Sequence, residues 1–124
     1  MPTIIKINEG YAVEQSSAFI NVTFYDEDDD LVVPDSITWT LTDENGTIIN
    51  EREDEAVSVP ASSITIVLTG DDLAFLSGET ADAVNRILMI EAVYDSDLQE
   101  DLAFKDAVVF PLVNLVAIAN GYLP

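Results

Sequence analysis

The clusters of potentially reactive side chains in this sequence consist of carboxylates. The chain has 124 residues, with 24 Asp and Glu against four Lys and Arg, and it contains neither His nor Cys. Without His, the most common general base and metal ligand is missing. Without Cys, there is no thiolate nucleophile, Cys-ligated metal or disulfide. Chemistry in this chain would therefore depend on carboxylates, as ligands of a hard cation or as a pair for acid–base catalysis.

The densest group of acids is the run at residues 26–30. Alternate carboxylates on a loop, here Asp26, Asp28 and Asp30, can bind Ca²⁺ through their oxygen atoms. The EF-hand pattern needs Gly at its sixth position, where this sequence has Leu31, and acidic runs are far more common than Ca²⁺ cages. We interpret the run as a solvated loop and keep the three Asp residues as weak metal candidates. No cofactor is predicted.

A second group of acids lies between residues 95 and 101 and consists of Asp95, Asp97 and Asp101, while Asp71 and Asp72 lie elsewhere. Two carboxylates catalyse glycoside hydrolysis only at a defined separation, and nothing in the sequence defines one here. Asp favours turns because its side chain bonds to nearby backbone groups. We interpret these residues as turn formers and predict no catalytic residues and no enzymatic activity.

The strong negative charge limits the classes of partner. The formal net charge is -20, and the basic residues Lys6, Arg52, Arg86 and Lys105 are too scattered to form a cationic patch. Binding to phosphates needs such a patch, so nucleic acid and anionic membranes are excluded as partners. The first ten residues lack the features of a signal peptide, and no apolar run approaches the length of about 20 residues that spans a bilayer.

Apolar and polar residues alternate with period two in several segments, which is typical of strands with one buried face. The alternation predicts strands at residues 3–8, 18–25, 37–42, 64–69, 86–94 and 105–116, with weaker candidates at 47–51 and 55–59. About seven short strands at this spacing predict an all-β, antiparallel sandwich or barrel rather than a parallel βαβ fold. Trp39 shares a face with Ile37 and Leu41, so we predict that it is a core residue.

The pair Asn45-Gly46 predicts a hairpin in one of two registers. A two-residue type I′ turn would place Leu41 opposite Asn50. A three-residue loop with Gly46 in the left-handed conformation would place Leu41 opposite Ile49. A slip of one residue exchanges the two faces of a strand, and the second register buries Ile49 beside Leu41. We therefore predict the three-residue loop.

One short helical turn is predicted after the strand at 64–69. Thr69 and Asp72 have the spacing of a capping box, and Gly78 suits a C-terminal stop. In a sandwich, this turn would form part of a crossover between the two sheets.

The segment 86–94 is apolar on both faces. Leu88 and Ile90 lie on one face, and Ile87, Met89 and Val93 lie on the other. Strands that are apolar on both faces are normally covered on both. The second cover is either a loop or tail of the same chain or a partner protein, and the sequence does not decide between them. Ile87, Met89 and Val93 are therefore candidate interface residues.

Three segments of the sequence carry a family resemblance: ITWTLTDENG at 37–46, RILMIEAVYDS at 86–96 and LAFKDAVVFPLVNLV at 102–116. They resemble small immunoglobulin-like proteins encoded among the structural genes of tailed bacteriophages. The resemblance extends over residues 17–118. It implies an immunoglobulin-like sandwich of about seven strands there, with an N-terminal segment carrying a short strand at 1–16 and a C-terminal tail at 119–124. It also implies a non-enzymatic role.

The resemblance implies a virion protein made in the host cytoplasm. The leading expectation is a capsid decoration or cement protein that binds other virion proteins, above all the major capsid protein, with self-association left open. A neck or tail component is the first alternative. A glycan-binding or adhesion module is the second, and its candidate exposed aromatics are Tyr11, Phe19, Tyr25 and Tyr122.

Overall fold

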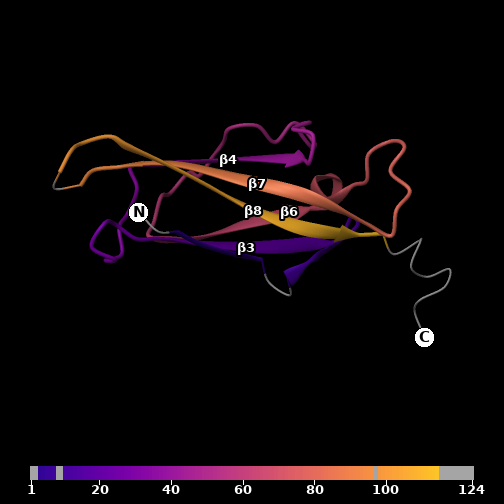
Figure 1. Ribbon diagram of the computed structural model, residues 1–124, viewed down its shortest axis with the longest axis horizontal. Coiled ribbons are helices and arrows are strands. Elements are labelled where there is room, and N and C mark those ends of the chain that lie inside the picture. The colour runs from indigo at the N-terminus through magenta and orange to yellow at the C-terminus, as the bar shows by residue number, and fades with distance from the viewer. Residues whose placement is uncertain (1–2, 8–9, 97, 115–124) are drawn as a thin grey trace.

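The chain folds into two β-sheets that pack against each other (Figure 1). The computed structural model describes residues 3–7, 10–96 and 98–114. Sheet A has the strand order β1-β3-β6 and sheet B the order β2-β8-β7-β4-β5. The strands of sheet A are β1 (Thr3–Ile7), β3 (Ser17–Phe24) and β6 (Ser63–Thr69). The strands of sheet B are β2 (Ala12–Val13), β4 (Ser36–Asp43), β5 (Glu55–Ala56), β7 (Ala83–Tyr94) and β8 (Leu102–Val113).

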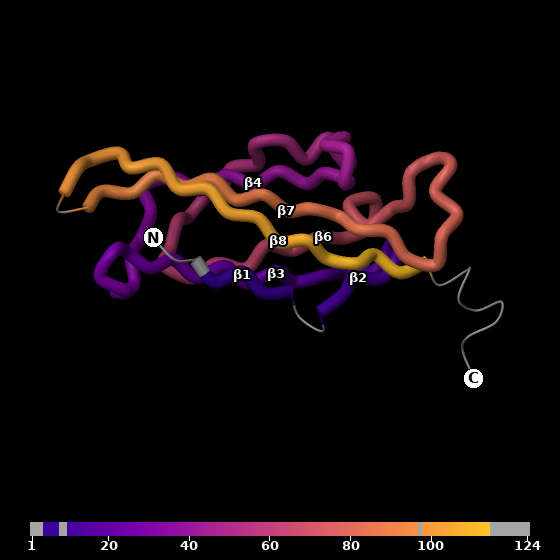
Figure 2. Tube along the Cα trace, in the orientation of Figure 1, coloured from indigo at the N-terminus to yellow at the C-terminus, as the bar shows by residue number. Residues whose placement is uncertain are grey.

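The chain passes repeatedly between the two sheets. It leaves sheet A after β1, adds β2 to sheet B, and returns for β3 (Figure 2). β4 and β5 then lie in sheet B, β6 in sheet A, and β7 and β8 again in sheet B. Neighbouring strands are antiparallel except β2 and β8, which are parallel. The predicted all-β class is therefore confirmed.

The predicted strands differ from the observed ones mainly at their ends. β7 and β8 each begin three residues earlier than predicted, because their pairing with each other continues beyond the alternating segments. The weak candidate at 47–51 forms no strand and makes a single bridge, from Ile48 to Thr42. The candidate at 55–59 is reduced to β5. β2 was not predicted, since two residues show no periodicity. Residues 8, 115 and 116 of the predicted strands lie outside the described part.

The hairpin after β4 has the predicted three-residue loop. The Ile49 N–H donates to the Leu41 carbonyl at 2.9 Å, and the Asp43 N–H donates to the Thr47 carbonyl at 3.0 Å. Gly46 has φ of +86°, which is the left-handed conformation that Gly adopts without a steric penalty. Leu41 and Ile49 are both buried, so burial of this pair selects the register.

The predicted helical turn is a 3₁₀ turn, η2 (Gly70–Leu73). The Thr69 N–H donates to the Asp72 Oδ2 at 3.2 Å, as the capping-box spacing predicts. Leu73 is fully buried. The turn follows β6 of sheet A and begins the connection to β7 of sheet B, so it is part of a crossover.

The core lies between the inner faces of the two sheets. Alternate residues of β3, β4, β7 and β8 supply it, and the Phe24 and Phe104 rings meet edge to face with centroids 5.9 Å apart. Trp39 packs against this core but is only partly buried. Trp39 lies opposite Glu55 of the two-residue edge strand β5, at the margin of sheet B, where the Arg52 guanidinium lies over its ring at 5.7 Å. The prediction of a core Trp is only partly confirmed.

Candidate functional surfaces

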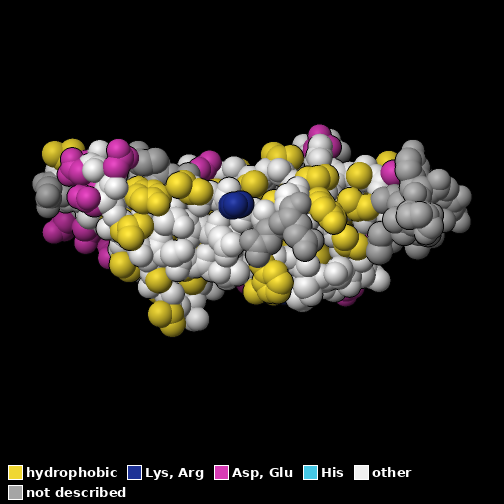
Figure 3. All heavy atoms as spheres, turned by 90° about the horizontal axis from the view of Figure 1, so that it is seen from below, with side chains coloured by type: hydrophobic (Ala, Val, Ile, Leu, Met, Phe, Trp, Pro, Cys, Tyr) yellow, Lys and Arg dark blue, Asp and Glu magenta, His cyan; other side chains and the backbone are white. Residues whose placement is uncertain are grey.

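Acidic residues are concentrated in the loops, and the strand surfaces are almost free of them. The described strands contain four acids, Asp43, Glu55, Glu91 and Asp106, while the whole chain has 24. Seen from one edge of the sheets, acidic side chains gather at one end and hydrophobic side chains are spread along the middle (Figure 3). The strand surfaces are therefore where apolar contacts with a partner are least opposed by charge.

The run at 26–30 forms a tight loop that Asp26 organises. Its Oδ1 accepts hydrogen bonds from the N–H groups of Asp28 at 2.9 Å and Asp30 at 3.0 Å. The Asp26 N–H donates to the Asp30 carbonyl, and a bridge from Tyr25 to Leu31 closes the loop. These hydrogen bonds account for the loop geometry. Among the described residues, the acids whose carboxylates converge are not Asp26, Asp28 and Asp30 but a different set.

The converging carboxylates belong to Asp35, Asp95 and Asp101, whose oxygen atoms lie within 4.8 Å of one another. Asp35 precedes β4, and the other two flank the loop between β7 and β8. The Asp35 N–H donates to the Val93 carbonyl at 2.7 Å, and the Asp101 N–H donates to the Asp95 Oδ1 at 2.9 Å. Asp97, which the sequence grouped with them, lies outside the described residues.

Like charges at this spacing repel each other. The negative charge of Asp95 raises the pKa of Asp35, and partial desolvation and Asp101 raise it further. Carboxylate oxygens suit a hard divalent cation. All three side chains are exposed, however, and turn hydrogen bonds already explain their positions, so we assign no metal to this cluster.

The opposite end of the molecule contains two ion pairs that the sequence did not reveal. Arg86 is fully buried on the inner face of β7 and binds Glu79 through two contacts of 2.6 and 3.0 Å. Arg52 binds the buried Asp72 at 2.7 Å. Arg86 lies two residues before Leu88 in the strand and therefore shares its inner face. This spacing was a signal that the Arg86 side chain points into the core.

Both pairs stabilise the charged form of their acid. The Arg86 guanidinium holds the pKa of Glu79 below its usual value. Burial raises the pKa of Asp72, but hydrogen bonds from Arg52, Asn50 and the Thr69 backbone lower it more, so the net shift is downward. These acids are structural groups that hold the connection from β6 to β7 against the core.

The three candidate interface residues lie together on the outer face of sheet B. Ile87, Met89 and Val93 are each partly buried, and the neighbouring Val109 on β8 is 58% exposed. Within the described residues, no strand or helix lies over this face (Figure 1). We call the four residues the β7–β8 face. No described strand or helix therefore supplies a second cover for this face.

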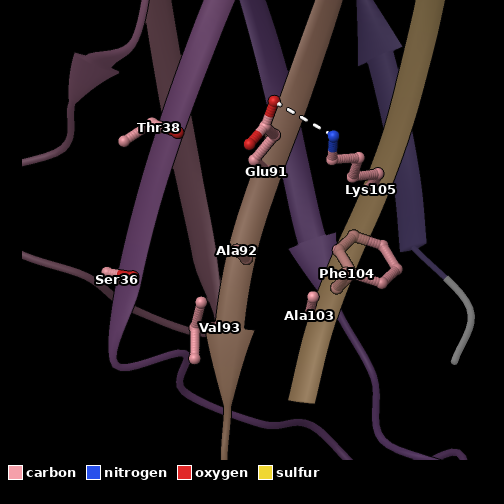
Figure 4. Close-up of a pocket in the computed structure, with 8 residues that line it drawn as sticks. All are labelled: Ser36, Thr38, Glu91, Ala92, Val93, Ala103, Phe104 and Lys105. Carbon is pink, nitrogen blue, oxygen red and sulfur yellow. Dashed lines mark ion pairs between the residues drawn. The ribbon is translucent and has the colours of Figure 1, made fainter. Parts of the chain in front are cut away.

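A salt bridge crosses the β7–β8 face. Glu91 and Lys105 lie opposite each other on β7 and β8, with Oε1 and Nζ 3.6 Å apart, and separate Val93 from Met89. Beside this pair is a shallow pocket between β4, β7 and β8, in which Val93 and Ala103 lie below the ion pair (Figure 4). The opposite charges neutralise each other, so the face has no net charge along these strands.

The aromatic candidates for glycan binding do not form one platform. Tyr11, beside β2 of sheet B, and Phe19, in β3 of sheet A, are 43% and 44% exposed. Tyr25 is partly buried, and Tyr122 lies outside the described residues. The outer face of sheet A instead combines Phe19 with exposed Val67, which lies directly opposite it on β6.

Comparisons of the chain with protein-family models, with curated proteins and with solved structures found no match. No helix within the described residues is long and apolar enough to cross a membrane. The function is therefore inferred from the composition of the chain, from its strand order and from the surfaces described above.

Proposed function

We propose that this chain is a non-enzymatic structural protein of a tailed-bacteriophage virion, with an immunoglobulin-like fold. Its most specific role is capsid decoration, in which a strand surface docks on neighbouring virion proteins, chiefly the major capsid protein. The observation that carries this proposal is an apolar β7–β8 face that no described strand or helix covers, on a molecule with a formal net charge of -20.

The strand order supports the immunoglobulin-like assignment. Immunoglobulin-like sandwiches place strands A, B and E in one sheet and C, F and G in the other. Here β1, β3 and β6 occupy the first set of positions, and β4, β7 and β8 occupy the second. β5 lies beside β4 as an extra edge strand, and no described strand takes the place of D.

The available chemistry supports a binding role over catalysis. The chain lacks His and Cys, and the converging Asp35, Asp95 and Asp101 lie on exposed turns. The Glu91 carboxylate beside the pocket of sheet B is already paired with Lys105. A general acid or base works best inside a concave site, and the three converging Asp side chains are exposed instead.

The β7–β8 face can supply binding energy that repeated copies multiply. Burial of three or four side chains of this size contributes a few kcal/mol at about 25 cal/mol per Å², before the entropic cost of association. In a symmetric shell, contacts with several subunits add through avidity. The acidic loops remain in solvent or face a basic patch of the partner.

The proposal is tested by mass spectrometry of purified virions of the phage that encodes the chain. We expect the chain in the particles, with a copy number comparable to that of the major capsid protein. A few copies per particle would instead indicate a neck or tail component. Absence from the particles, with the chain present in the infected cell, would contradict a structural role.

A further inference from the structure

The edge of β6 is open for pairing with another strand. β3 and β6 are antiparallel, and the Phe24 N–H donates to the Ser62 carbonyl while the Gly70 N–H donates to the Ser16 carbonyl. Hydrogen-bonded pairs recur at every second residue, so the even-numbered residues of β6 bond to β3. The N–H and C=O groups of Ser63, Thr65 and Val67 therefore point away from β3, and no described backbone group bonds to them.

The edge of β8, on the other sheet, is protected in three ways. Lys105 places a charge on it, and the Ala107 N–H is occupied by the Asp106 carboxylate at 2.8 Å. Pro111 has no N–H to offer. Charged side chains and Pro are the usual means by which proteins prevent edge-to-edge association. The outermost strands of sheet B, β2 and β5, have two residues each.

β6 has none of these protective features. Its sequence SITIVLT contains no Pro, Gly or charged residue, and the chain has no charged residue between Glu55 and Asp71. Seven uncharged residues with high β-propensity are the pattern that favours strand pairing with another chain. Ser63 and Thr65 are exposed, and Val67 is 49% exposed, so solvent reaches this strand.

We infer that the β6 edge binds the β6 edge of a second copy of this chain, forming an antiparallel, two-fold symmetric dimer. The Thr69 N–H is already bound to Asp72, so the free N–H groups are those of Ser63, Thr65 and Val67. The symmetric register places Thr65 opposite Thr65 of the second copy, and Ser63 opposite Val67. All three residues then form hydrogen-bonded pairs, which joins the two A sheets into one.

Charge favours this edge over the acidic surfaces as the place where two copies of the chain meet. A copy of the chain brings a formal charge of -20, which opposes association through any acidic surface. The uncharged stretch from residue 56 to 70 lets two copies meet there with little repulsion. The Thr65 pair is also a favourable cross-strand pair, and Ile64 of one copy lies opposite Ile66 of the other on the inner face. Salt should strengthen the dimer by screening the remaining repulsion.

The test is sedimentation velocity at increasing protein concentration, up to about 1 mM in moderate salt. We expect the wild-type chain to shift from 13.5 kDa to twice that mass. Thr65→Pro removes an N–H that the fold does not use, and should weaken the dimer about tenfold or more. Ala103→Pro is the matched control, since it removes an outward N–H from the β8 edge. It should leave the dimer unchanged.

Two further measurements keep the test decisive if the Pro variant unfolds. Thr65→Lys places two like charges opposite each other in the dimer and should also give a monomer with a native circular dichroism spectrum. Amide exchange at Ser63, Thr65 and Val67 should slow as the concentration rises. A wild-type monomer at all concentrations, or a dimer that Thr65→Lys leaves intact, would overturn the inference. Because β6 and the β7–β8 face belong to different sheets, these results are independent of the virion role.

Discussion

The two ends of the molecule use carboxylates in opposite ways. At the ion-paired end, formed by η2, the connection at 74–82 and the segment at 50–55, Arg86 and Arg52 neutralise Glu79 and Asp72 in buried or half-buried contacts. At the acidic end, formed by the loops at 25–35 and 95–101, there is no Lys or Arg in the sequence. Charge therefore stabilises one end and repels at the other, and the strand surfaces between them are nearly uncharged.

Acid should act most strongly on the ion-paired end, because it affects both ion pairs together. The folded pKa values of Glu79 and Asp72 are lowered, so their contribution is complete above their unfolded values of about 4.3 and 3.9. It is lost as the pH falls through the lower folded pKa values. We expect urea unfolding at pH 7, 5, 4 and 3 to show a steep loss of stability below about pH 4. A free energy of unfolding that stays level to pH 3 would be inconsistent with paired carboxylates.

Removing one partner of the buried pair should give the largest effect of a single substitution. Glu79→Gln leaves the Arg86 charge in the core without its counter-charge, and should cost about 2–4 kcal/mol in urea unfolding. The lower part of the usual range is expected, since the Glu79 side chain is 22% exposed. Asp95→Asn removes the same charge from the acidic end and serves as the control. An equal loss of unfolding free energy in both variants would contradict the claim that carboxylates stabilise one end and not the other.

Removal of the Trp39 side chain should destabilise the protein less than removal of a fully buried Trp would. It packs against the core from the sheet margin and supports the Arg52 guanidinium. We expect Trp39→Ala to cost about 1.5–3 kcal/mol, less than the roughly 3–5 kcal/mol of a core Trp. Thermal unfolding followed by circular dichroism measures the difference, and Trp39→Phe should recover most of it. A loss at the upper limit for core residues would place Trp39 deeper than its exposure indicates.

Neutralising the acidic end should stabilise the protein slightly. The folded pKa of Asp35 is raised, so its charge costs stability at neutral pH and costs nothing below about pH 3.9, where the acid is protonated in both states. Asp35→Asn should therefore raise Tm at pH 7 in low salt, and the gain should shrink in 1 M NaCl, where the screening length is about 3 Å. Glu53→Gln, an equal charge change beside Arg52, should give no gain. A gain that persists in high salt would point to a cause other than repulsion.

The strands were predictable because the information that determines them is local. Alternation in β3, β4 and β6, and the Asn45-Gly46 turn, depend on residues that are neighbours in the sequence. The register at Leu41 and Ile49 followed from burial of a single apolar pair. β2 was missed because its two residues pair with the distant end of β8.

The charged sites were not predictable for the opposite reason. Asp35 meets Asp95 only because β4 pairs with β7, and Arg86 meets Glu79 only when the connection at 74–82 folds over the core. Which strand becomes an edge is also decided by topology, so the sequence SITIVLT gave no indication that the outer side of β6 would stay unpaired. The interface candidates Ile87, Met89 and Val93 were visible as a second apolar face, and their function remains a prediction.

The proposed binding to virions through the β7–β8 face can be tested directly. Particles that lack this chain are mixed with purified variants and sedimented, and the folded state of each variant is checked by circular dichroism. Met89→Asp with Val93→Asp places charge on the β7–β8 face and should abolish co-sedimentation, while Asp28→Asn with Asp30→Asn alters only the acidic end and should still bind. Loss of binding in the acidic-end variant, with normal binding by the folded β7–β8 variant, would contradict the proposal that the β7–β8 face binds the virion.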